Sequence, residues 1–154
     1  MSYNEWIESE ITKLVTEHGV VPPPYFEYPE IHPFSIGWRM GGGESYMMVF
    51  WTWASREKGG MNEAQRIAYC RQFPPPPLWL TWVINFIWRS EDDDRMDLDP
   101  EAGECSAYFK RTEELGLGTE EECRRAWKLE DEKMEAENES DEEKEEEEGK
   151  ESAK

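Results

Sequence analysis

Apolar side chains recur at helical spacing along much of the chain. In residues 3–18 they fall on one side of a 3.6-residue period, and Ser2 and Glu5 have the spacing of a capping box. Asn62 and Gln65 have the same spacing ahead of a second segment, which must end before a run of prolines. The pattern therefore predicts a first helix over residues 3–18 and another that starts after Asn62.

Residues 78–88 are apolar almost all round. A helix of this kind belongs at the centre of a core, because none of its faces suits water. The segment falls short of the roughly 20 residues that are needed to cross a bilayer. The pattern thus predicts a buried helix and no association with a membrane.

Two further helices are predicted from capping residues in the second half of the chain. Asp99 can cap a helix that has Pro100 at its first position and an apolar stripe along one side. Thr119 and Glu122 have capping-box spacing ahead of a last apolar turn, which ends at Trp127.

The middle of the chain is less regular. Five prolines between positions 22 and 33 predict an extended passage. Residues 34–40 alternate between apolar and polar or small side chains, which predicts a short strand. Residues 44–58 fit either a helix or a buried strand that pairs with residues 34–40 across a glycine turn. The helix is favoured, because Glu44 lies in its first turn and basic residues lie at its end.

Composition divides the chain after Trp127. Residues 1–127 hold all eight tryptophans, whereas residues 128–154 hold 14 acidic and 5 basic side chains with few apolar ones. Such a segment buries too little surface to fold alone, so we expect it to be disordered beyond a few solvated helical turns. The sequence therefore predicts a mainly α protein. It consists of one compact Trp-rich domain of about five helices and a disordered acidic C-terminal tail, with one short β-hairpin near residues 34–53 as an open alternative.

The net charge bears on the class of partner. With 36 acidic and 17 basic residues the formal net charge is −19, which excludes a nucleic-acid binder that works through a basic surface. Residues 91–127 hold 13 acidic and 5 basic side chains, and a dense negative surface attracts a basic protein. We therefore expect a basic protein partner. The residues expected to contact it are Asp92, Asp93, Asp94, Asp97, Asp99, Glu101 and Glu104.

Three consecutive glycines, at 41–43, cost backbone entropy unless the fold requires them. The favoured interpretation is a tight connection that passes close to Trp side chains, with an ion pair between Arg39 and Glu44. Two others stay open: part of a partner-binding surface, and a phosphate loop, although the Lys and Ser or Thr of a P-loop are missing. The residues of a candidate pocket or loop here are Trp38, Arg39, Glu44, Trp51 and Trp53.

Signals for catalysis and metal binding are weak. His18 and His32 are the two imidazole bases of the chain, and neither lies near a nucleophile motif. Asp97, Asp99 and Glu101 follow the first ligand positions of a calcium loop, but the glycine and the bidentate glutamate of that loop are missing. We therefore expect no catalytic residues, no cofactor and no metal.

The cysteines and the N-terminus bear on the compartment. Three cysteines without a CxxC pair predict buried, reduced thiols, and the acidic first twenty residues do not resemble a secretory signal. Both features predict a cytoplasmic protein.

Three classes of function remain. The favoured one is a non-enzymatic binding or inhibitor protein, comparable to an immunity protein, an antitoxin or a nucleic-acid mimic, whose acidic surface near residues 91–105 contacts a basic partner. The second is a small enzyme or ligand-binding protein with a Trp-lined pocket around residues 34–53. The third is an accessory subunit of a larger assembly. The partner's identity and the oligomeric state stay open.

Overall fold

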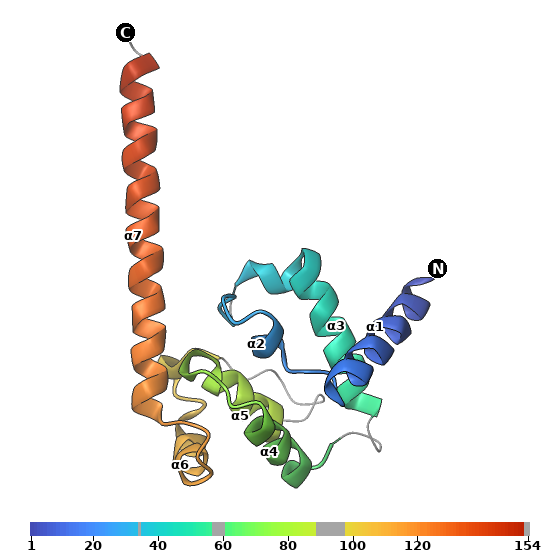
Figure 1. Cartoon of the computed structure of the whole chain (residues 1–154). Helices are drawn as coiled ribbons and strands as arrows, with labels where there is room; N and C mark the ends of the chain where they lie inside the picture. Colours follow the sequence, from blue (N-terminus) through green and yellow to red (C-terminus); the bar gives the residue numbers. More distant parts are fainter. Residues whose placement is uncertain (34, 57–60, 89–97, 153–154) are drawn as a thin grey trace.

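The computed structural model describes residues 1–33, 35–56, 61–88 and 98–152, and the regular structure within these ranges is entirely helical (Figure 1). The α-helices are α1 (Tyr3–His18), α2 (Pro24–Glu27), α3 (Gly41–Arg56), α4 (Glu63–Gln72), α5 (Leu80–Trp88), α6 (Ser106–Glu114) and α7 (Glu120–Ser152). Three short 3-10 helices are η1 (Ile36–Arg39), η3 (Pro77–Trp79) and η4 (Pro100–Ala102). The predicted mainly α class is confirmed, with seven α-helices in the described ranges instead of about five.

Capping bonds set the start of two helices as the sequence predicts. At α1, the Ser2 hydroxyl accepts from the backbone N–H of Glu5 at 3.2 Å, and the Glu5 carboxylate accepts from the N–H of Ser2 at 3.4 Å. Asn62 and Gln65 form the same reciprocal pair ahead of α4, at 2.8 and 2.9 Å. These bonds satisfy N–H groups that have no partner within the helix, so the local sequence is sufficient to define both starts.

The strand predicted from residues 34–40 is wrong. Residues 36–39 form η1, in which the Ser35 hydroxyl accepts from the N–H of Gly37 at 3.1 Å. The following segment is helix α3, so an extended chain here would have no strand to pair with, and the hairpin alternative is wrong as well. The helix favoured for residues 44–58 is confirmed as far as Arg56, whereas residue 34 and residues 57–58 lie outside the described part.

The three glycines form the first turn of α3 and bring it close to η1. A Cβ atom on Gly43 would lie 2.2 Å from the carbonyl oxygen of Gly37 and 3.4 Å from the Trp38 ring. The predicted tight connection is therefore confirmed. The predicted ion pair between Arg39 and Glu44 is wrong, because both described side chains are exposed and no ion pair joins them.

The proline-rich passage contains one short helix that the sequence did not predict. Pro24 is the first residue of α2, where its missing N–H costs nothing. Tyr25 is buried, and its hydroxyl donates to the carbonyl of Phe73 at 2.5 Å. The passage therefore packs on the core of its own chain.

Aromatic side chains fill the core around α5, in agreement with the predicted buried helix. Leu80 and Ile84 are fully buried, and the ring of Trp82 stacks on that of Phe86 with centroids 5.4 Å apart. Phe50 of α3 contacts both rings, at 5.7 Å each. Among the described helices, none has the length and apolar character that a membrane span requires.

The helix predicted from Asp99 onward is divided in two. Asp99 caps η4, where its carboxylate accepts from the N–H of Glu101 at 2.9 Å. Gly103 then takes a left-handed conformation, with φ 83°, and α6 begins at Ser106. The glycine ends the first helical turn, which the apolar stripe alone did not reveal.

Helix α7 begins in the globular part and continues into the acidic tail. The Thr119 hydroxyl accepts from the N–H of Glu122 at 3.2 Å, as its spacing predicts. The first turns pack against η3, η4 and α6, and the rest stands away from the other helices (Figure 1). Residues 131–139 are all exposed, so the predicted lack of buried surface is confirmed there, although the helix runs to Ser152 and exceeds the few turns expected.

Candidate functional site

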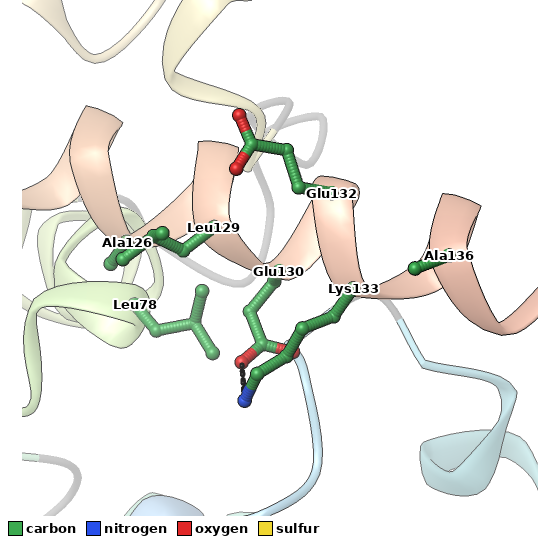
Figure 2. Close-up of a pocket in the computed structure, with 7 residues that line it drawn as sticks. All are labelled: Leu78, Ala126, Leu129, Glu130, Glu132, Lys133 and Ala136. Carbon is green, nitrogen blue, oxygen red and sulfur yellow. Dashed lines mark ion pairs between the residues drawn. The ribbon is translucent and has the colours of Figure 1, made fainter.

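Two cavities flank α7 where it leaves the globular part. The larger, which we call the α7 groove, has a volume of about 460 Å³ (Figure 2). It is lined by Leu78, Ala126, Leu129, Glu130, Glu132, Lys133 and Ala136. The smaller, which we call the His32 cavity, has a volume of about 260 Å³. It is lined by His32, Ser35, Asp99, Trp127, Asp131 and Met134.

The α7 groove has apolar walls that the helical repeat of α7 generates. Ala126, Leu129 and Ala136 follow one another at intervals of three and seven residues, which places them along one side of the helix. Leu78 of η3 lies across from them (Figure 2). Leu129 is 55% exposed, so the groove presents a large apolar side chain to solvent.

Charged side chains border the α7 groove. Glu130 and Lys133 extend to the same side of α7 as Leu78 and form an ion pair at 3.7 Å, whereas Glu132 projects to the other side (Figure 2). The ion pair neutralises the single cation among the lining residues. The charged lining residues therefore carry a formal net charge of −1, which is that of Glu132.

Two packed rings form the base of the His32 cavity. The imidazole of His32 lies edge-on to the indole of Trp127, with centroids 4.6 Å apart. The Trp127 indole N–H donates to the carbonyl of Leu78 at 3.1 Å, which holds the ring between the cavity and the α7 groove. The carbonyl of His32 accepts from the indole of Trp38 at 3.0 Å and from the N–H of Ser35 at 2.8 Å. These bonds fix the loop that carries the imidazole.

Two carboxylates come to the His32 cavity from different parts of the chain. Asp99 is half-buried and is held by its capping bond to the N–H of Glu101. Asp131 lies one turn after Trp127 on α7, so both side chains lie on the same side of that helix. Met134 follows on the same side and is 43% exposed.

Burial governs the protonation of His32, which is 7% exposed. Loss of hydration lowers its pKa below the usual 6.5, while the negative charges of Glu130, Asp131 and Asp99 act in the opposite direction. The net shift is downward, so the imidazole is neutral at pH 7. The imidazole therefore adds no positive charge to the cavity at pH 7.

The described part of the chain includes three of the seven predicted partner-binding residues. Asp92, Asp93, Asp94 and Asp97 lie outside the described residues. Asp99 lines the His32 cavity, and Glu104 is exposed without lining either cavity. Glu101 forms an ion pair with Arg124, so the carboxylate of Glu101 already has a partner within the chain. Arg124 also pairs with Glu120, at 2.9 Å.

The candidate Trp pocket is part of the hydrophobic core. Trp38 and Trp53 are buried, and Trp51 is half-buried against the core. The ring of Trp38 lies 5.4 Å from that of Trp79, and the ring of Trp53 lies 5.8 Å from that of Tyr69. None of these tryptophans, nor Arg39 or Glu44, lines either cavity described above.

Sequence reasoning did not identify most residues of the two cavities. It considered His32 only as a base without a nearby nucleophile motif, and it placed Leu129 and Met134 in the acidic tail. The available signal was the recurrence of those two apolar residues near Trp127, on an otherwise acidic stretch. Within the described residues, no group of three His, Cys, Asp or Glu side chains is arranged to hold a metal ion.

Comparison of the chain with protein-family models, with curated proteins and with solved structures finds no match.

Proposed function

We propose that this protein is a non-enzymatic, cytoplasmic binding or inhibitor protein whose α7 groove takes a basic amphipathic helix of a protein partner. The observation that supports the proposal is the apolar row of α7, with Leu129 exposed and charged side chains at its border, at the point where the helix leaves the domain. Binding of an amphipathic helix in an apolar groove is a recurring mode of peptide recognition.

The shape and charge of the groove determine the chemistry of the occupant. An amphipathic helix contacts such a groove through apolar residues at intervals of three and four, and Leu78 and Leu129 would receive them. Helix α7 carries 17 acidic and 6 basic residues, so Lys and Arg on the flanks of the partner helix are favoured over Asp and Glu. The analogy with immunity proteins and antitoxins concerns acidity, because a dense negative surface speeds association with a basic partner.

The packing of the tryptophans favours this function over a small enzyme with a Trp-lined pocket. Trp38 and Trp53 are needed to fill the core, and neither lines a described cavity. The acidic residues of the tail have a different role in the proposal, because exposed charge speeds the encounter with a basic partner without fixed contacts.

Calorimetric titration of the full-length chain with a synthetic amphipathic Leu/Lys helix tests the groove. We expect saturable binding that weakens as salt rises, and loss of binding in Leu129→Glu. Asn138→Glu is the matched control, because it adds the same charge at an exposed position that lines neither cavity. Equal binding of a scrambled peptide of the same composition, or equal effects of the two substitutions, would contradict the proposal.

Removal of residues 140–154 tests the role of the tail. The truncation deletes 8 acidic and 3 basic residues and leaves every residue of the α7 groove in place. We expect slower association at low salt with little change in dissociation, because steering acts on the encounter. If the association rate changes neither with the truncation nor with the salt concentration, the tail does not steer the partner.

A further inference from the structure

We propose that prolines 74–77, which we call the proline run, bind the aromatic-lined groove of an SH3-type domain in a partner protein. This contact is separate from the α7 groove, since it uses a different segment and a different kind of partner. The run connects α4 to η3. Proline-rich segments in the polyproline II conformation are the ligands that such grooves bind.

The backbone of the proline run is extended before any partner binds. The proline ring fixes φ at about −65°. Residues 74–76 each precede another proline as well, which disfavours the helical region for them. Pro76 has φ −66° and ψ 152°, which are polyproline II values. The run is therefore stiff, so little conformational entropy is lost when a groove binds it.

Two prolines of the run present one edge to solvent. Pro74 and Pro77 are exposed, whereas Pro75 and Pro76 are half-buried. Polyproline II has about three residues per turn, so Pro74 and Pro77 lie one turn apart on the same side. This is the P-x-x-P spacing that SH3-type grooves recognise. Residues 22–24, the other run of consecutive prolines, are buried and offer no such edge.

The ends of the neighbouring helices account for only part of the proline run. Pro74 prevents α4 from continuing, and Pro77 is the first residue of η3, where its missing N–H costs nothing. Pro75 and Pro76 serve neither end. Among the described residues, none donates a backbone hydrogen bond to the carbonyls of Pro74 and Pro75. Both carbonyls can therefore accept from the Tyr and Trp donors of an aromatic groove.

A cation precedes the proline run and narrows the choice of groove. The Arg71 side chain is exposed, and its Nε and Nη2 donate to the carbonyl of Leu115 at 3.4 and 3.3 Å. These bonds hold the guanidinium in place, and it has further N–H donors for a carboxylate. We therefore expect a groove with carboxylates at the end that meets Arg71, because a guanidinium and a carboxylate form charge-assisted hydrogen bonds.

Binding of the full-length chain to an array of purified SH3 domains, followed by calorimetry with the tightest binder, tests the proposal. We expect saturable binding that a free polyproline peptide displaces. The double variant Pro74→Ala/Pro77→Ala should weaken binding roughly tenfold or more, because both exposed rings leave the groove. Arg71→Gln should weaken it about two- to fivefold, as expected for loss of an exposed ion pair.

Pro29→Ala is the matched control, because it removes an exposed proline outside the run and should leave the affinity unchanged. Circular dichroism shows whether each variant keeps its helix content. If the double variant loses helix content, Arg71→Gln and the polyproline competitor still decide the question. The proposal is overturned if no domain binds, if the polyproline peptide does not compete, or if Arg71→Gln binds as tightly as the parent.

Leu129→Glu separates this contact from the α7 groove. Leu129 lines the groove and lies far from the proline run in sequence, so the substitution should leave SH3 binding unchanged while it abolishes binding of the Leu/Lys helix. Loss of SH3 binding in this variant would place the domain in the α7 groove and overturn the proposal. Failure of the helix to bind the parent chain would contradict the proposed function and leave the SH3 result unaffected.

Discussion

The backbone of Gly43 passes so close to the carbonyl of Gly37 that a Cβ atom on Gly43 would lie 2.2 Å from that oxygen. The contact joins the first turn of α3 to η1. It explains a glycine in a helix, where glycine is otherwise unfavourable. The neighbouring Gly42 is less restricted, since its Cβ would approach only the hydroxyl of Tyr28, at 3.2 Å, and no backbone atom.

We expect Gly43→Ala to lower the free energy of unfolding by about 1–3 kcal/mol, because the two backbone segments would have to separate. Gly42→Ala is the matched control and should be neutral or slightly stabilising, since alanine is the better helix former. Urea denaturation followed by circular dichroism measures both. Similar losses in the two variants would show that the close approach is unimportant.

We expect Trp127→Ala to cost about 3–5 kcal/mol of unfolding free energy, in the range of buried Trp truncations. Trp127 is 6% exposed, and its loss would leave the Leu78 carbonyl without the indole donor. Leu129→Ala, two residues further along α7 and 55% exposed, should change stability by no more than about 0.5 kcal/mol. Thermal unfolding of the two variants compares them, and equal costs would mean that α7 is not anchored by Trp127.

We expect His32 to make stability depend on pH. Its pKa in the folded state lies below the usual 6.5, so the unfolded chain binds the proton more readily. Stability is therefore highest above about pH 6.5 and falls as the pH drops toward the folded-state pKa. The carboxylates of Glu130, Asp131 and Asp99 face the imidazole and limit this loss.

His32→Gln isolates the effect, because glutamine does not titrate. The difference in unfolding free energy between the parent and the variant should shift in favour of the variant as the pH falls from 8 to 5. A difference that stays constant over this range would rule out a lowered pKa for His32.

We expect all three thiols to resist alkylation in the folded protein. Cys70, Cys105 and Cys123 are buried, and burial raises the pKa of Cys70 and of Cys123 to about 12. Thiolate is the reactive form, so both are almost entirely unreactive at pH 8. Ellman's reagent should report no fast thiol in buffer and three in guanidinium, whereas a fast thiol in buffer would contradict the buried positions.

Helix starts could be predicted from the sequence where a few neighbouring residues decide them. The reciprocal bonds of Ser2 with Glu5 and of Asn62 with Gln65 span three residues, so the spacing alone identifies them. The apolar run that became α5 was recognised as central for a similar reason. Its side chains leave no polar face.

Predictions that depended on distant parts of the chain were less successful. Residues 35–40 alternate like a strand, but a strand needs a partner, and the neighbouring segment became helix α3. The Trp residues near the glycines suggested a pocket, yet Trp38 and Trp53 were required by the core. The local sequence pattern cannot distinguish a residue that lines a cavity from one that is packed in the core.

The sequence by itself determined the helical class, the main caps and the division between a Trp-rich domain and an acidic extension, because hydrogen bonds over three or four residues and bulk composition decide these. Only the tertiary structure brought His32, Asp99 and Asp131 to one cavity. The three residues come from a proline-rich loop, a helix cap and α7, and the packing of Trp127 against His32 and Leu78 places them together. Contacts between segments so far apart leave no periodic signal in the chain, so the candidate site became visible only in the folded protein.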